Sequence, residues 1–216
     1  VARDRKTPLT SIISYVELLK EEEGLPDHVK DYISNLEIKS QRLKTMVQDV
    51  LEVSMAASVE LPVKLETIDF AKLLRQTMAD MEEEIHSSCV TVRAQIPEEE
   101  EFIRADGQRL YRVFQNLIQN ALKYSLDGSR VYIALKREDG MLTASVTNTS
   151  ADELDGSIDY TARFTRGDSS RTDGGSGLGL SIARSFTEAC DGTFRIAIIA
   201  DLFTAYVTFK AVSPEE

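Results

Sequence analysis

The spacing of apolar residues predicts a helical hairpin at the start of the chain. In residues 6–23 apolar side chains recur at helical intervals and form one stripe, which consists of Leu9, Ile12, Ile13, Val16 and Leu19. Gly24 and Pro26 interrupt this pattern, and Asp27 stands where it can cap a second helix. The second helix carries Val29, Leu36, Leu43 and Val50 at intervals of seven residues. A seam of this length exceeds what one partner helix covers, so two copies would form a four-helix bundle. A monomeric hairpin packed on the rest of the chain is the alternative.

After residue 57 the pattern changes to a mixture of helices and strands. Residues 58–64 lose the helical period and include Pro62, so we place a linker there. Beyond it we expect helices at 70–85, 106–125 and 177–190, and strands at 90–96, 130–137, 142–148, 192–199 and 203–211. The expected inward side chains of the first two helices are Phe70, Leu73, Leu74, Met78, Met81, Leu110, Val113, Phe114, Leu117 and Ala121, and Asp106 would cap the second. The whole chain is therefore predicted to be α+β, with a hairpin domain over 1–57 and, over 65–212, a mixed sheet with helices on one face.

Composition narrows the possible functions. The net charge is −11, with 36 acidic and 25 basic residues, which disfavours a nucleic-acid partner because such a partner needs a basic face. Cys89 and Cys190 are far apart and indicate neither a disulfide framework nor a zinc site; we expect buried or inert thiols. No apolar run is as long as a membrane span. Because the chain starts at Val1 inside a motif, we expect an upstream part to be missing.

A glycine-rich stretch, "GGSGLGLSIA" at 174–183, precedes an expected helix. Gly175, Gly177 and Gly179 remove side chains at the point where a loop becomes a helix, so backbone N–H groups can approach phosphate oxygens. The stretch lacks the Lys-Ser/Thr of a P-loop and has the spacing GxGxG, unlike the GxGxxG of dinucleotide sites. By itself this pattern also fits a merely flexible loop.

A second candidate group lies in "QNLIQNALKYS". Asn116 and Asn120 are four residues apart and share a helix face, with Lys123 and Tyr124 about one turn further on. An amide oxygen can complete the shell of a Mg²⁺ ion that otherwise keeps water and phosphate oxygens. Lys123 can balance phosphate charge, and Tyr124 offers a flat face to a base. Two asparagines on an apolar face are costly to bury unless they find partners, which disfavours a packing role.

These motifs, together with "TARFTRGDSSR" and the helical hairpin before them, resemble the catalytic core of bacterial sensor histidine kinases over essentially the whole chain. The resemblance implies a homodimerising, histidine-phosphotransfer hairpin over 1–57 and an ATP-binding domain of the GHKL superfamily. It also implies ATP and Mg²⁺ as cofactors and a response-regulator receiver domain as partner. The chain would be the cytoplasmic portion of a membrane-attached protein, anchored only through the missing upstream segment.

The resemblance assigns roles to individual positions. Asn120 would ligate Mg²⁺, Asn116 and Lys123 would contact the phosphates, and Tyr124 would line the adenine pocket. Phe164 and Arg166 would belong to the family's Phe box, with Arg166 near the γ-phosphate as a catalytic residue and Arg163 beside them. The hinge of the ATP lid would consist of Gly175, Gly177, Leu178 and Gly179.

Two positions depart from the family pattern. The first is the segment "VTNTSAD", where Asn148 stands for the family's adenine-binding aspartate and Ser150 for its glycine. An amide oxygen still accepts a hydrogen bond but lacks charge assistance. We therefore expect ATP binding that is weaker than with the aspartate.

The second departure lies in "RDRKTPL", where Arg3 occupies the place of the family's phosphoacceptor histidine. A guanidinium stays protonated and has no lone pair, so it cannot act as the nucleophile. His28 and His86 are too distant and are expected to be ordinary surface residues. Asp4, which normally polarises the histidine, and Thr7, which normally orients water against a phospho-aspartate, are both present.

The sequence therefore predicts a two-component histidine kinase core in which ATP-dependent transfer to histidine, and then to a regulator aspartate, is lost. A degenerate kinase that acts as a response-regulator phosphatase or a regulatory scaffold is the alternative. A hydrolytic GHKL ATPase is less favoured, because it leaves the hairpin unexplained.

Overall fold

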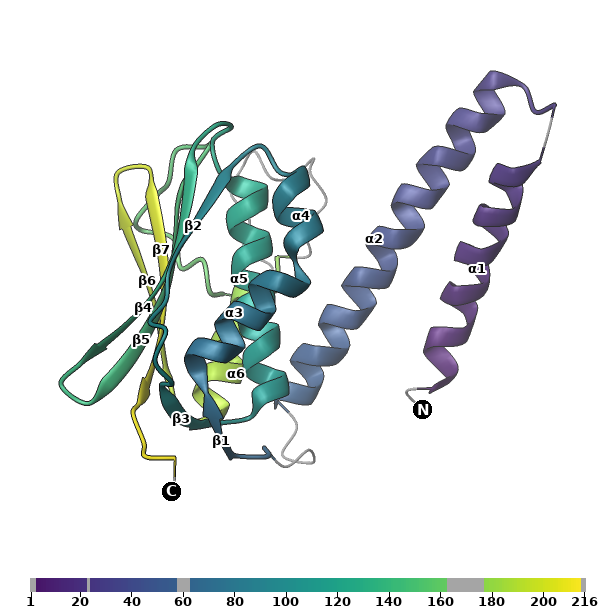
Figure 1. The fold of residues 1–216 in the computed structure, drawn as a ribbon. Coiled ribbons are helices and arrows are strands. Elements are labelled where there is room, and N and C mark those ends of the chain that lie inside the picture. The colour runs from purple at the N-terminus through teal and green to yellow at the C-terminus, as the bar shows by residue number, and fades with distance from the viewer. Residues whose placement is uncertain (1–2, 23, 58–62, 163–176, 215–216) are drawn as a thin grey trace.

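The computed structural model describes residues 3–22, 24–57, 63–162 and 177–214 and contains a helical hairpin beside an α/β layer domain (Figure 1). Helix α1 (Arg3–Glu21) has 19 residues and helix α2 (Asp27–Ala57) has 31, so α2 extends beyond its partner. Ile13, Val16 and Ile33 are buried in the hairpin. None of the described helices is long and apolar enough to cross a membrane.

Asp27 does not cap α2, as the sequence led us to expect, but is its first residue. The Pro26 carbonyl accepts hydrogen bonds from the backbone N–H groups of Val29 and Lys30, so Pro26 takes the capping position. The Asp27 carboxylate lies in the first turn, where its charge still favours the positive end of the helix.

The α/β domain alternates short and long elements. In chain order these are β1 (Glu66–Asp69), α3 (Phe70–Asp80), α4 (Glu82–Ser87), β2 (Thr91–Gln95), β3 (Phe102–Ala105), α5 (Gly107–Tyr124), β4 (Arg130–Glu138), β5 (Met141–Thr149), α6 (Gly179–Ala189), β6 (Thr193–Ile199) and β7 (Leu202–Lys210). The main sheet has the order β2-β4-β5-β7-β6, in which β2 runs parallel to β4 and every other pair is antiparallel. Strands β1 and β3 form a small antiparallel sheet of their own. This confirms the predicted mixed sheet.

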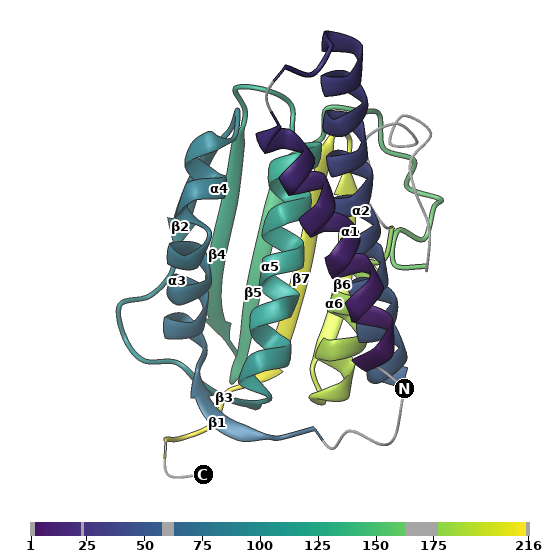
Figure 2. The same ribbon diagram turned by 90° about the vertical axis from the view of Figure 1, so that its right-hand side faces the viewer.

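Helices α3, α5 and α6 cover one face of the main sheet, and the hairpin lies outside α6 (Figure 2). The centre of the core is α5, which presents all five expected inward side chains to the sheet with at most 2% exposure. Phe114 from this helix and Phe209 from β7 both contact the Phe70 ring, with centroids 5.6 and 6.0 Å from it. The C-terminal part of α2 packs against α6, so the hairpin meets the domain at that helix.

Three local features differ from the sequence expectation. The helix expected at 70–85 is two helices: α3 ends at Asp80 with Met81 as its C-cap, and α4 starts again at the acidic run Glu82–Glu84, where carboxylates favour a helix N-terminus. Strands β1 and β3 were not expected. Each has only four residues, which is too short to show an alternating pattern.

Candidate functional site

Helix α5 positions the two candidate asparagines. Its first turn is capped by Asp106, whose carboxylate accepts a hydrogen bond from the Arg109 backbone N–H at 3.1 Å. Asn116 then lies on the buried side, with only 7% exposure. Its Nδ2 atom has no hydrogen-bond partner among the described residues. An amide buried without a partner costs about 1–3 kcal/mol, so this group is better explained by a ligand than by packing.

The glycine motif meets these asparagines at the start of α6. A Cβ atom on Gly179 would lie 3.4 Å from Nδ2 of Asn120 and 3.6 Å from Oδ1 of Asn116. The two motifs, which are about 60 residues apart in sequence, thus face each other with no side chain between them. The first backbone N–H groups of α6 have no partner within the helix and carry its positive end, which favours an anion there. The amides of Asn116 and Asn120 and the first backbone N–H groups of α6 are therefore groups that suit a phosphate.

The end of α5 meets the end of β5. The Tyr124 carbonyl accepts a hydrogen bond from the Ala151 backbone N–H at 2.9 Å, and Ser125 forms an isolated antiparallel bridge with Ser150. Asn148 on β5 is 5% exposed and lies two residues before Ser150, at the end of β5 that meets α5. The Lys123 ammonium lies 5.0 Å from the Tyr124 ring centroid. The candidate adenine and phosphate residues of α5 and β5 are thus brought to one end of the domain.

Leu178 has a structural position within this site. Its side chain is 1% exposed and belongs to the core, while its carbonyl accepts hydrogen bonds from the Ile182 N–H and the Ser181 hydroxyl. The preceding Gly177 has φ = +70°, a conformation that favours glycine. These two residues fix the entry of the chain into α6.

Several expected site residues lie outside the described part of the chain: Arg163, Phe164, Arg166 and Gly175. The side chains of Arg3, Asp4 and Thr7 lie outside it as well, although the helical backbone of α1 begins at Arg3. Both histidines are exposed, as expected. Of the cysteines, Cys190 is buried and Cys89 is exposed, and burial raises the pKa of the Cys190 thiol.

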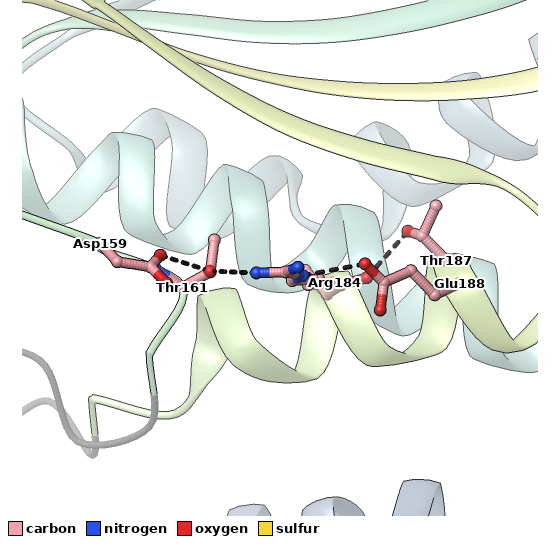
Figure 3. Close-up of polar contacts among 6 residues, drawn as sticks. Asp159, Thr161, Arg184, Thr187 and Glu188 are labelled. Atoms are coloured by element: carbon pink, nitrogen blue, oxygen red, sulfur yellow. Dashed lines mark hydrogen bonds and ion pairs between the residues drawn. The ribbon is translucent and has the colours of Figure 1, made fainter.

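Sequence reasoning missed a polar chain on the outer side of α6. The Arg184 guanidinium donates to the Thr161 hydroxyl, which donates to the Asp159 carboxylate (Figure 3). The hydrogen bonds from the hydroxyl and N–H of Thr161 hold the pKa of Asp159 below its usual range. The spacing Asp-x-Thr signals a local turn, but nothing in the sequence connects that turn with Arg184, 23 residues later.

Two known protein families match the chain, one over the α/β domain and one over the helical hairpin. Residues 105–212 match the family described as "Histidine kinase-, DNA gyrase B-, and HSP90-like ATPase", and residues 1–58 match the "His Kinase A (phospho-acceptor) domain". The chain belongs to the histidine kinase family. Its two parts are those of a histidine kinase catalytic core in two-component signalling, with the phospho-acceptor helices first and the ATPase-type layer second.

Known relatives of this histidine kinase core are longer proteins. The sensor protein SphS of Synechococcus elongatus is 34% identical over 202 residues, which cover 89% of this chain and 48% of SphS. The chain spans about half the length of this curated relative. Among solved structures, full-length ShkA in complex with AMPPNP has a TM-score of 0.78 at 21% identity, over 99% of this chain and 46% of ShkA. ThkA in complex with the response regulator TrrA gives 0.68 at 22% identity, over 100% of this chain and 61% of that one. These two likenesses concern the fold.

Proposed function

We propose that the kinase core binds ATP with Mg²⁺ between the end of α5 and the start of α6. The observation that carries this proposal is the close approach of Gly179 to both asparagine amides, next to a buried Asn116 amide that lacks a partner. Three features lie together here: Gly179, which has no side chain, the Asn116 amide, which has no partner among the described residues, and the N-terminus of α6. Phosphate oxygens satisfy all three. The family match and the AMPPNP complex of ShkA support the same ligand class.

Each residue would have a separate part in holding the nucleotide. The Asn120 amide oxygen would ligate Mg²⁺, and Asn116 and Lys123 would contact phosphate oxygens. Tyr124 would line the adenine pocket, and the Asn148 amide oxygen would accept a hydrogen bond from the adenine amino group. When bound, ATP supplies the phosphoryl group. The protein contributes positioning and charge stabilisation, in which Arg166 would join Lys123.

The binding proposal is tested by calorimetric titration with Mg²⁺ and a non-hydrolysable ATP analogue. Asn120→Ala removes the proposed metal ligand and should raise the Kd roughly tenfold or more, as expected for a lost bond to a charged group. Gln119→Ala is the matched control. Its amide donates instead to Glu84 at 3.4 Å, so the Kd should be unchanged. Equal affinity of Asn120→Ala and the parent would show that the site is misassigned.

We also propose that the core works as a homodimer with a response-regulator receiver domain as its partner. The hairpin supports the first part, because it leaves Leu36 and Leu43 of the seven-residue seam exposed. The complex of ThkA with TrrA supports the second. In this proposal residues 1–57 dimerise, 58–64 link, and 65–212 bind ATP, as the cytoplasmic portion of a longer membrane-attached protein.

We further propose that Arg3 prevents autophosphorylation. The histidine position of the family is the attacking nitrogen, and a guanidinium offers no lone pair in its place. With labelled ATP the parent chain should gain no acid-labile label, whereas Arg3→His should gain it. Stable acid-labile label on the parent chain would rule this out.

A second function, dephosphorylation of the regulator, is favoured by what remains around Arg3. Asp4 and Thr7 are both present in the first turns of α1. Removal of phosphate from a phospho-aspartate needs a water held in line, and the Thr7 hydroxyl can hold it. The parent chain should then speed the loss of phosphate from its regulator, and Thr7→Ala should abolish that effect. If Thr7→Ala is as active as the parent, this second function is wrong.

A further inference from the structure

Positive charge is concentrated on the face of the main sheet that the helices leave open. Helices α3, α5 and α6 lie on one side of the sheet, and no described helix covers the other side, which we call the outer face (Figure 1). Side chains alternate along a strand, so the burial of Val131 and Ile133 on β4 directs their neighbours to the outer face. The same alternation on all five strands places these exposed basic residues there: Arg93, Arg130, Lys136, Arg195 and Lys210. Among the outward side chains of the five strands, which the structure describes in full, Glu138 is the only carboxylate.

This charge contrasts with the rest of the molecule. The chain has 36 acidic and 25 basic residues, yet the outer face holds five basic residues and one acidic residue. None of the five basic side chains has a carboxylate within 4 Å in the part of the chain that the structure describes. Arg137, whose side chain alternates to the other face, does form an ion pair, with Glu101 at 3.0 Å. Like charges held on one face without partners repel one another, and an acidic partner would offset that repulsion.

The centre of the outer face offers hydrogen-bond donors. The Arg195 guanidinium lies over the ring of its cross-strand neighbour Tyr206, 4.2 Å from the ring centroid, which fixes the position of this cation. Two pairs of hydroxyls on β5 and β7 are each 3.0 Å apart, Thr143 with Thr208 and Thr147 with Thr204. Each pair uses one hydroxyl hydrogen in its own bond and leaves the other to donate. Hydroxyl and guanidinium donors side by side suit the oxygens of carboxylates.

The size of the outer face indicates an extended partner. Four strand spacings separate β2, which carries Arg93, from β6, which carries Arg195, or about 19 Å. Along β4, Arg130 and Lys136 are about 20 Å apart. Charges at these separations cannot converge on one small anion. The outline of about 400 Å² is roughly half of what each partner buries in a stable interface, which indicates a weak, transient contact.

The rim of the outer face distinguishes a protein from a membrane as the partner. Glu138 and Asp139 stand at the β4–β5 turn, and Asp201 stands at the β6–β7 turn, at the opposite end of the sheet. A membrane surface would meet these carboxylates together with the basic residues, whereas a protein surface of limited size fits between them. Arginine and tyrosine are also enriched in protein interfaces, and the face carries Tyr132 and Tyr206 beside three arginines.

We propose that the outer face of the main sheet is a docking surface for an acidic region of a protein partner, whose carboxylates bind the arginines around Tyr132 and Tyr206. This inference goes beyond the proposed nucleotide function and does not depend on it. Helices α5 and α6, which carry the proposed nucleotide site, lie on the opposite side of the sheet (Figure 1). Nucleotide and acidic partner can therefore be bound at the same time.

Fluorescence anisotropy of a labelled polyglutamate peptide, titrated with the whole chain, tests the proposal. The parent should bind the peptide, and more weakly as the NaCl concentration is raised. Arg93→Glu and Arg195→Glu should each raise the Kd about tenfold, because each replaces an attraction by a repulsion. Lys72→Glu is the matched control: it makes the same change of charge at an exposed residue of α3, on the other side of the sheet, and should bind as the parent does. Thermal unfolding checks that all three variants are folded.

Three results would overturn the inference. The first is a parent chain that does not bind the peptide. The second is an equal loss of affinity in Lys72→Glu, because the peptide would then respond only to the net charge of the protein. The third is a parent chain that binds vesicles of phosphatidylglycerol and phosphatidylcholine more tightly than the peptide and loses that binding in Arg195→Glu. This last result would assign the outer face to a membrane instead of a protein.

Discussion

Gly179 is the residue at which binding and stability can be separated most cleanly. An added Cβ would sit at 3.4 Å from the nearest asparagine atom, which is an ordinary contact distance, so the fold can accept it. We expect Gly179→Ala to change the free energy of unfolding by no more than about 1 kcal/mol, since alanine suits a helix at least as well as glycine. The methyl group would nevertheless stand where phosphate is proposed to lie. Nucleotide affinity should therefore fall roughly tenfold, as measured by titration beside chemical denaturation.

At Gly192, unlike at Gly179, we expect an added methyl group to lower stability and leave nucleotide affinity unchanged. A Cβ there would lie 2.5 Å from two ring carbons of Phe209 and 2.9 Å from Thr187, far inside contact distance. Gly192→Ala should lower the free energy of unfolding by about 1–3 kcal/mol through overpacking, while the Kd of the folded protein stays at its parent value. If both variants lose stability and affinity together, Gly179 has no special place in the site.

At the scale of elements, α2 shows how one helix can serve two interfaces. Ile33 faces α1 and is 5% exposed, whereas Leu36 and Leu43 are 51% and 45% exposed. These two leucines are seven residues apart and share one side of the helix. On α1, Ile12 and Leu19 are exposed with the same spacing. The packing of α1 on α2 therefore leaves part of the seven-residue seam, Leu36 and Leu43, uncovered.

We expect Leu43→Asp to convert a dimer into a monomer, because it puts a charge into the proposed apolar interface. Sedimentation velocity at micromolar concentration measures this directly. Ile38→Asp is the matched control, since Ile38 is 60% exposed but lies about 140° around the helix from Leu43. It should remain a dimer. A parent chain that sediments as a monomer, or an equal loss of dimer in both variants, would contradict a bundle built on this seam.

For the whole molecule, the sequence predicted those elements whose pattern is long and local. Helix α5 is the best example, because 18 residues of clear helical period and the Asp106 cap specify it without help from the rest of the chain. The alternation of apolar and polar residues predicted the long strands β4, β5, β6 and β7. The mixture of helices and strands predicted helices on one face of the sheet. Asn116, Asn120 and Gly179 were identified by type and spacing, and the structure brings them together.

What escaped prediction depends on contacts between distant segments. Strands β1 and β3 stabilise each other across more than 30 residues, so neither shows a signal of its own. The bond between Arg184 and Thr161 arises only once β5, β7 and α6 are in place. Arginine on an exposed helix face is so common that its residue type carries no information about such a contact.

The parallel pairing of β2 with β4 has a consequence for the order of folding. Strands β4 and β5 are joined by a two-residue turn in which Asp139 and Gly140 have φ of 49° and 74°, the geometry that closes a hairpin quickly. Strand β2 reaches β4 only after β3 and the whole of α5 have crossed between them. Closing that long segment costs chain entropy before any pairing compensates for it. We therefore expect refolding to start at the β-hairpins, within microseconds, and β2 to join the sheet last. During refolding, the backbone amides of β2, at the edge of the sheet farthest from α6, should then become protected from hydrogen exchange later than those of the central strands.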